Sequence, residues 1–100
     1  MSLSETLKKI YTILDKPGMF AIESVDDISL IITWEIHMNG NEEVSAFFAE
    51  FTKYLEKDSN EFLHGFSWCK IIRLYSGSNS HSLQLFRKHL DAFIPLWQIK

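Results

Sequence analysis

The chain has 100 residues, of which 46% are hydrophobic and 14% aromatic, and its formal net charge is −3 at pH 7. This length fits a single domain over residues 1–100 with a sizeable core, and the single cysteine excludes an intramolecular disulfide. With no signal-peptide core, no apolar run of membrane-spanning length and a sequence pI of 5.7, we expect a cytoplasmic protein that binds neither membranes nor nucleic acid.

The first predicted helix starts at Leu3 and ends near Asp15. Ser2 and Glu5 form a capping box in front of it. Its apolar residues recur in steps that place them on one helix face: Leu3, Leu7, Ile10, Tyr11 and Leu14. Residues 16–20, Lys-Pro-Gly-Met-Phe, are expected to form a tight turn, because proline disfavours a helical residue before it and glycine follows.

The segment between Ser24 and Asn39-Gly40 fits two secondary structures. Ser24 can cap a helix whose first turn contains Asp26 and Asp27, and the Asn-Gly pair can end it. Within it, however, residues 28–37 nearly alternate between apolar and polar side chains, which is typical of a strand. We favour the helix, because a lone strand needs a partner and no other segment is clearly a strand.

The clearest predicted element is a helix over residues 42–57 with Asn41 as its cap. Its inward face repeats without interruption, through Val44, Phe47, Phe48, Phe51, Tyr54 and Leu55. Residues 58–60 are expected to form a break, and residues 61–66 a short irregular or helical turn.

Two further helices complete the predicted fold. Ser67 caps the first, with Trp68, Ile71, Ile72 and Tyr75 on one side, and residues 76–80 form a loop. The second places Leu83, Phe86, Leu90 and Phe93 inward. Pro95 is expected to end or kink this last helix, and the apolar residues Leu96, Trp97 and Ile99 to dock on the core. The sequence therefore predicts an all-α single compact domain of about five amphipathic helices.

No residue pattern predicts catalysis, a metal site or a cofactor. The four histidines are His37, His64, His81 and His89, and none pairs with another at the spacing of three or four that a helical metal site needs. Cys69 is expected to be a buried, inert thiol, although Lys70 and Arg73 leave a reactive thiol open. The chain also lacks a phosphate-binding glycine loop.

Charge is sorted along the chain. Residues 23–61 carry ten acids and two bases, a net charge of −8, whereas residues 62–100 carry a net charge of +4. The candidate partner-binding residues are the acids of this middle third: Glu23, Asp26, Asp27, Glu35, Glu42, Glu43 and Glu50. Four of these acids, Asp26, Asp27, Glu42 and Glu43, lie in the first turn of a predicted helix, where the helix dipole favours negative charge. The dipole does not explain why bases are nearly absent from the segment. An electrostatic field of one sign attracts partners of the opposite charge, so we expect a basic partner.

Two tryptophans have ambiguous positions. Trp34 and Trp97 are expected to belong to the core, with an exposed interface anchor as the alternative.

Three segments resemble a family of small bacterial immunity-type proteins found beside polymorphic toxins and contact-dependent growth inhibition systems. The turn at residues 16–20 is similar to the family's Lys/Arg-Pro-Gly-Met-Tyr, with Phe20 in place of the tyrosine, and is followed by Ala21-Ile22 in place of Leu-Gly. The other similar residues are Ser67, Trp68, Ile71 and Ile72, and then Leu83, Phe86, Leu90, Asp91 and Phe93. The resemblance implies a mostly helical inhibitor protein and carries over no functional residue.

Together, the resemblance and the charge pattern predict a cytosolic immunity protein without enzymatic activity. It would bind and neutralise a cognate toxin domain, expected to be basic and a nuclease, through the acids of the middle third. The alternative is a non-catalytic helical adaptor or structural subunit, homodimeric through Trp34 or Trp97. An enzyme would need a pocket with convergent polar groups.

Overall fold

The computed structural model describes residues 2–57 and 66–99 and confirms the all-α prediction. Its elements are α1 (Leu3–Asp15), a 3₁₀ helix η1 (Pro17–Phe20), α2 (Val25–His37), α3 (Glu42–Lys57), α4 (Trp68–Tyr75) and α5 (Asn79–Ile99). The described ranges contain no strand, so the favoured helix over residues 28–37 is correct. The predicted break at residues 58–60 and most of the turn at 61–66 lie outside the described residues.

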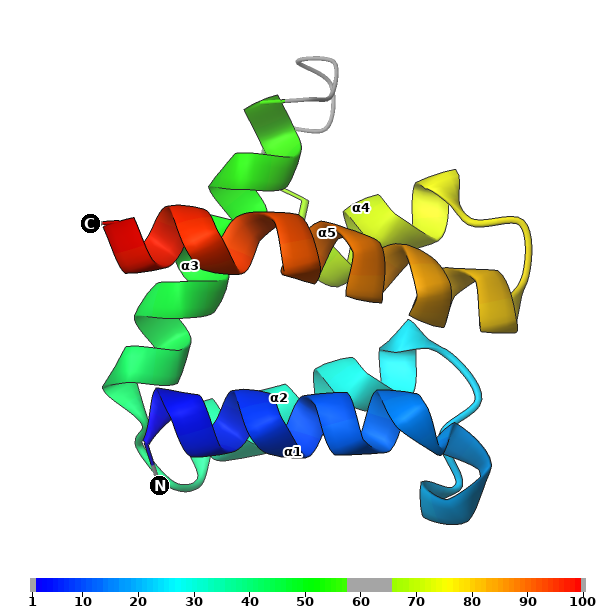
Figure 1. The fold of residues 1–100 in the computed structure, drawn as a ribbon, viewed down its shortest axis with the longest axis horizontal. Coiled ribbons are helices and arrows are strands. Elements are labelled where there is room, and N and C mark those ends of the chain that lie inside the picture. Colours follow the sequence, from blue (N-terminus) through cyan, green and yellow to red (C-terminus); the bar gives the residue numbers. More distant parts are fainter. Residues whose placement is uncertain (1, 58–65, 100) are drawn as a thin grey trace.

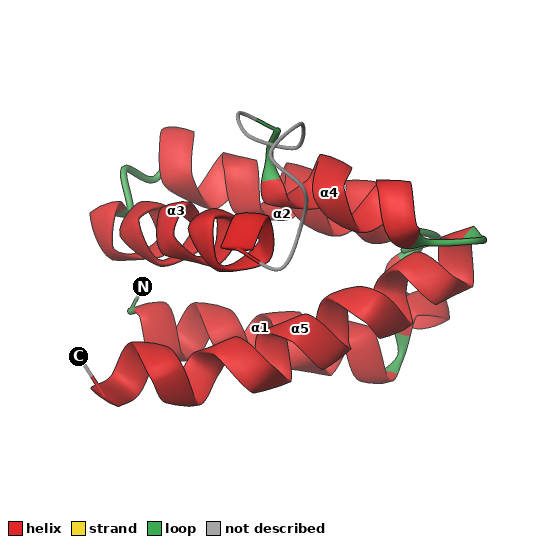
Figure 2. Ribbon diagram, turned by 90° about the horizontal axis from the view of Figure 1, so that it is seen from above, coloured by secondary structure: helices red, strands yellow, loops and turns green. Residues whose placement is uncertain are grey.

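The helices form two layers. Helices α1 and α5 lie antiparallel in one layer, and α2, α3 and α4 form the other (Figures 1 and 2). Helices α3 and α5 are central, because each of them packs against all of the other α-helices. The N-terminal end of α1 and the C-terminal end of α5 therefore both lie near α3, on the same side of the molecule (Figure 1).

An aromatic cluster from α3, α4 and α5 makes the centre of the core. Phe47, Phe51 and Phe86 are fully buried. The ring of Phe86 stacks on Trp68 with 5.1 Å between centroids, and Phe51 lies 5.4 Å from Phe93. Each ring removes a large apolar area from water, so this cluster joins the two layers.

The predicted caps are present. The hydroxyls of Ser2, Ser24 and Ser67 each accept a hydrogen bond from a backbone N–H in the first turn of their helix. Asn41 Oδ1 accepts from the Val44 N–H at 3.2 Å and so caps α3. Gly40, with φ of +63°, occupies the left-handed conformation that lets the chain turn sharply between α2 and α3.

The last helix begins earlier than predicted, and it does not end at Pro95, which was one of the two effects expected of that residue. Helix α5 begins at Asn79, inside the predicted loop, because the Ser78 hydroxyl accepts the His81 N–H at 3.1 Å and caps it. It also continues through Pro95 to Ile99. Proline removes the hydrogen bond to the Asp91 carbonyl, but both residues are exposed, so water can satisfy that carbonyl.

Of three side chains predicted to face the core, Tyr75 and Leu96 are exposed and Trp97 is packed against the core. Tyr75 is exposed at the end of α4, so its predicted inward position is wrong, as is the predicted docking of Leu96. Trp97 does pack on the core, with its ring centroid 5.4 Å from that of Phe47.

Within the described part of the chain, no helix is both long and apolar enough to cross a membrane.

Candidate partner-binding surface

Glu35 does not lie on the surface, contrary to its place among the predicted contact residues. Its side chain is only 8% exposed. Its carboxylate accepts hydrogen bonds from Asn41 Nδ2 at 3.0 Å and Asn39 Nδ2 at 2.9 Å, and its backbone carbonyl accepts the Asn41 N–H. These bonds hold the turn between α2 and α3, so Glu35 has a structural role that the sequence spacing did not reveal.

The Glu35 contacts predict a pH-dependent contribution to stability. Hydrogen bonds from Asn41 and then Asn39 lower the pKa of Glu35, because they favour the carboxylate. The folded pKa therefore lies below the unfolded one, so this stabilisation is present above the ordinary glutamate range, roughly pH 4 to 5, and is lost as the pH falls through the folded pKa. In Glu35→Gln, the new amide N–H₂ group faces the N–H₂ group of an asparagine, and two donors cannot bond to each other. We therefore expect the free energy of unfolding at pH 7 to fall by about 1–2 kcal/mol.

Urea unfolding of both proteins between pH 3 and pH 7, on the order of five pH values, would check this prediction. The difference in the free energy of unfolding between wild type and Glu35→Gln should shrink toward acid pH, because only the wild type has a carboxylate at this position to protonate. A difference that stays constant over the whole range would contradict the assigned role of Glu35.

The two acids in the first turn of α2, Asp26 and Asp27, both contact other groups of the fold. Asp27 Oδ2 accepts the Glu23 N–H at 2.8 Å and the Ser24 N–H at 3.3 Å, which completes a capping box. Asp26 Oδ2 lies 3.3 Å from Arg73 Nε on α4. Both carboxylates therefore have partners within the fold, as the helix-dipole argument predicts for acids at this position.

Two acids of α3 are also engaged. Glu43 Oε1 accepts the Leu3 N–H at 2.8 Å and so attaches the start of α1 to α3. Glu50 lies 3.6 Å from Lys53 Nζ one turn later. Among the described residues, Glu23 and Glu42 are the predicted contact acids that are exposed and whose carboxylates have no partner in the fold. The acidic surface available to a partner is therefore narrower than the charge count implies.

An exposed apolar stripe runs along the outer side of α2, opposite its buried residues Ile28 and Ile32. We call it the α2 stripe, and its members are Leu30, Ile31, Trp34 and Met38. Trp34 is 60% exposed, so the expectation that it belongs to the core is wrong. The spacing of four between Leu30, Trp34 and Met38 places them on one helix face.

The sequence did contain a signal for the stripe. Helix α2 has apolar residues on both of its faces, which is the property that also made residues 28–37 resemble a strand. A helix that is apolar all round is normally buried on all sides. Here one face is open to solvent.

Cys69 and His81, two residue types that often act in catalysis or metal binding, are engaged in contacts within the fold. Burial, and then the hydrogen bond from its S–H to Asp26 Oδ1, raise the pKa of Cys69 to about 11, so the thiol is protonated at neutral pH, as predicted for an inert cysteine. His81 Nδ1 accepts the Gly77 N–H at 2.8 Å. The described residues contain no group of three or more histidines, cysteines or acids that could hold a metal ion, and His64 lies outside them.

Comparison with protein-family models, curated proteins and solved structures finds no match to this chain.

Proposed function

We propose that this chain is a cytoplasmic immunity-type protein that neutralises a cognate toxin domain by binding it through the α2 stripe and the acids at its two ends. The observation that carries the proposal is the exposure of Trp34 within an apolar stripe, in the one third of the chain that is strongly acidic. The resemblance of residues 16–20 and of the later segments to immunity-type proteins gives the class of partner.

The α2 stripe has the composition of a protein-binding surface. Leu30 and Met38 are 70% and 63% exposed, and they flank Trp34 on the same helix face. Contiguous apolar side chains at the surface mark interaction sites more often than isolated ones do. Tryptophan is also enriched among residues that contribute most to binding free energy.

Charge around the stripe favours a basic partner. Glu23 precedes α2 and Glu42 lies just after it, and no lysine or arginine occurs between residues 23 and 52. Nuclease domains carry basic sites for nucleic acid, so an acidic surface can occupy such a site and block it without catalysis. Opposite charges would also accelerate the encounter of the two proteins.

The same exposure of Trp34 supports a second candidate, a homodimeric adaptor. Trp97 is less suited to this role than Trp34, because it packs against Phe47 and Phe93. Self-association through the α2 stripe would bring Glu23 and Glu42 of two copies close together, and neither carboxylate has a partner among the described residues. Sedimentation velocity over a range of concentrations separates the candidates, since the immunity proposal expects a monomer and the adaptor a dimer.

Charge reversal at the two free acids tests the electrostatic part of the proposal. We expect Glu23→Lys with Glu42→Lys to lower the association rate with a basic toxin domain on the order of tenfold at low salt, and to reduce the salt dependence of that rate. Stopped-flow mixing at several salt concentrations measures both. These two positions are preferable to Asp26, Asp27 and Glu43, whose reversal would also break bonds within the fold.

The matched control is Gln84→Lys with Ala92→Lys, which adds two positive charges, the change made by one acid reversal, at exposed positions of α5. It should slow association much less, because α5 lies in the layer that does not contain α2 (Figure 2). An association rate that is equally slow for this control and for each single reversal would show a general effect of net charge, and would contradict a defined acidic contact.

A further inference from the structure

The turn between α2 and α3 contains the pair Asn39-Gly40, and both residues are exposed. Together with Glu35, Asn41 and Glu42 they line an open hollow of about 510 Å³. Gly40 has φ of +63°, and apart from its chain neighbours no atom lies within 4 Å of the position that a Cβ would occupy there. Solvent therefore reaches Asn39 and the peptide bond that follows it.

The backbone nitrogen of Gly40 is not engaged in the fold. Its N–H donates to no acceptor among the described residues, whereas the next N–H, that of Asn41, donates to the Glu35 carbonyl at 3.3 Å. Glycine also lacks the Cβ that crowds the backbone in other residues. The Gly40 nitrogen can therefore approach the side-chain carbon Cγ of Asn39 without breaking a hydrogen bond.

We propose that Asn39 is a site of spontaneous deamidation. In this reaction a bond forms between Gly40 N and Asn39 Cγ, the Cγ–Nδ2 bond breaks, and Nδ2 leaves as ammonia with the proton that Gly40 N has lost. Water then opens the resulting five-membered ring at either carbonyl, which gives aspartate or isoaspartate. The reaction needs no oxidant, reductant or second protein. Because the new carboxyl group ionises, the turn gains one negative charge.

The new charge arises beside a carboxylate that the fold already uses. Asn39 Nδ2 donates to Glu35 Oε2 at 2.9 Å, and Glu35 is only 8% exposed. Deamidation removes this donor and leaves a second carboxylate facing Glu35, where solvent screens their repulsion only in part. Isoaspartate also adds one carbon to the main chain between α2 and α3. Either product should therefore weaken the turn.

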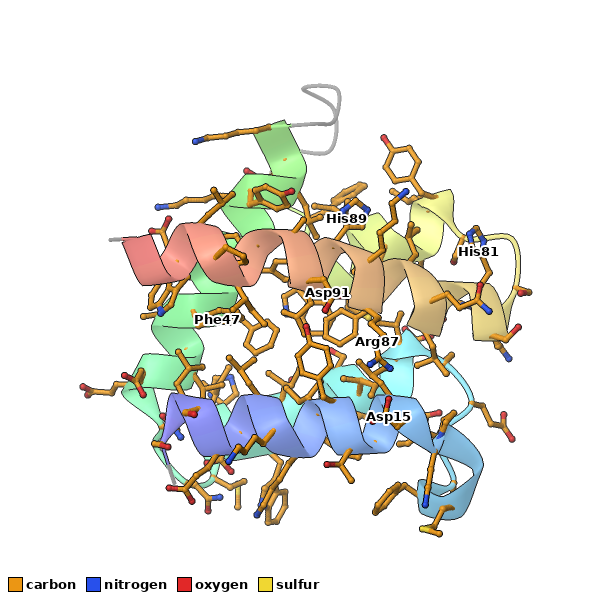
Figure 3. The ribbon with its side chains drawn as sticks, viewed as in Figure 1. Asp15, Phe47, His81, Arg87, His89 and Asp91 are labelled. Atoms are coloured by element: carbon orange, nitrogen blue, oxygen red, sulfur yellow. The ribbon has the colours of Figure 1, made fainter. Side chains whose placement is uncertain are left out.

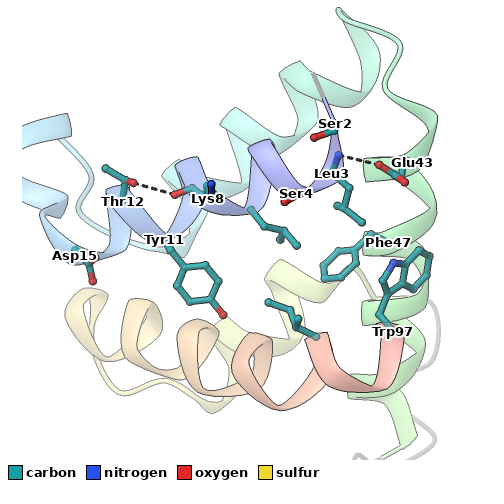
Figure 4. A pocket seen from close by; sticks show the side chains of 12 residues that line it. Ser2, Leu3, Ser4, Lys8, Tyr11, Thr12, Asp15, Glu43, Phe47 and Trp97 are labelled. Carbon is teal, nitrogen blue, oxygen red and sulfur yellow. Dashed lines mark hydrogen bonds between the residues drawn. The ribbon is translucent and has the colours of Figure 1, made fainter. Parts of the chain in front are cut away.

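The turn leads directly into a contact that attaches α1. The C-terminal end of α1 is held by α5, since Arg87 Nη1 lies 2.6 Å from Asp15 Oδ1 (Figure 3). The N-terminal end is held by Glu43 in the first turn of α3, whose Oε1 accepts the Leu3 N–H at 2.8 Å (Figure 4). Deamidation should loosen the N-terminal end of α1, because the position of Glu43 depends on the turn before it.

Incubation of the full chain in mildly alkaline buffer, followed by peptide mass mapping, tests the reaction. The chain contains its own controls, since Asn41 is followed by Glu42 and Asn79 by Ser80. Asn39 should deamidate on the order of tenfold faster than either, because the residues after the controls carry side chains that raise the barrier. Circular dichroism confirms that the chain stays folded. Deamidation of Asn39 that is no faster than that of Asn41 and Asn79 would refute the proposal.

Three variants test the consequence for the turn. Asn39→Asp reproduces one product, and it should lower the urea midpoint at neutral pH and speed hydrogen exchange in the first turn of α1. In a Glu35→Gln background the same change should lower the midpoint much less, because the glutamine amide can donate to the new carboxylate. Asn79→Asp adds the same charge at the exposed start of α5 and should leave the midpoint unchanged.

An unchanged midpoint in Asn39→Asp, or an equal loss with and without the Glu35 carboxylate, would contradict the effect assigned to deamidation. No toxin domain takes part in these experiments, so their results do not depend on the proposed function.

Discussion

Replacing Phe51 with alanine is expected to lower the free energy of unfolding by about 3–5 kcal/mol, the largest stability effect of any single change considered for this chain. Phe51 is fully buried and its ring lies within 6.1 Å, centroid to centroid, of Phe48, Trp68, Phe86 and Phe93. Removing the ring leaves a cavity where α3, α4 and α5 meet. The loss is a large part of the roughly 5–15 kcal/mol that stabilises a typical domain.

Urea unfolding followed by circular dichroism measures this effect, with Phe20→Ala as the matched control. Phe20 is exposed at the end of η1, and its removal should change stability by less than about 1 kcal/mol. If Phe51→Ala is too unstable to purify, Phe51→Leu keeps the test possible, with an expected loss of about 1–2 kcal/mol. Equal stability of the Phe51 and Phe20 variants would contradict the central aromatic cluster.

Replacing Trp34 with alanine is expected to weaken binding of the toxin domain by about 2–4 kcal/mol, or roughly 30- to 1,000-fold, and to leave the fold intact. Trp34 lies at the middle of the α2 stripe, so a partner that covers the stripe must bury its ring. Trp34 does not belong to the core that the described residues form, and the free energy of unfolding should therefore change by less than about 0.5 kcal/mol.

Leu74→Ala is the matched control for the α2 stripe. Leu74 is an exposed apolar residue on α4, outside the acidic segment, and its removal should change the affinity by less than about threefold. Calorimetric titration of both variants against the same domain gives the comparison. Wild-type affinity in Trp34→Ala, or an equal loss in Leu74→Ala, would exclude the stripe as the main contact.

The fold followed from local patterns. Ser24, Asn41 and Ser67 cap the helices that they were expected to cap, because capping depends on hydrogen bonds to residues two or three positions away. The inward face of α3 is also predicted correctly, since its apolar period is unbroken. Pro95 does not end α5, which was one of its two expected effects. Its position on the exposed side of α5 lets water replace the missing bond, and the sequence alone does not give that orientation.

The surface was harder to predict, because its charges are arranged by contacts between distant segments. Glu43 bonds to Leu3 and Asp26 to Arg73, across 40 and 47 positions of sequence. Glu35 is the clearest case, since its spacing to Asn39 and Asn41 gave no sign that the carboxylate is buried. Much of the acidity of the middle third therefore stabilises the fold. The charge that remains for a partner is confined to a few positions around α2.

The exposure of Trp34 could not be predicted from the sequence either. An apolar residue within an apolar segment is expected in the core, because burial of large side chains usually stabilises the fold. The helix has two apolar faces, and the helices packed against it, α3, α4 and α5, cover only the one that contains Ile28 and Ile32. Which face is covered depends on the packing of the whole domain.

The proposed function predicts that the gene immediately upstream encodes a large secreted protein with a variable C-terminal domain. Binding between this chain and that domain would test the central claim most directly. Isothermal titration calorimetry should give a one-to-one complex with a nanomolar dissociation constant, in which the α2 stripe is buried. An absence of binding to that domain, together with a stable dimer of the chain in which Trp34 is shielded from solvent, would contradict the immunity proposal and support the homodimeric adaptor.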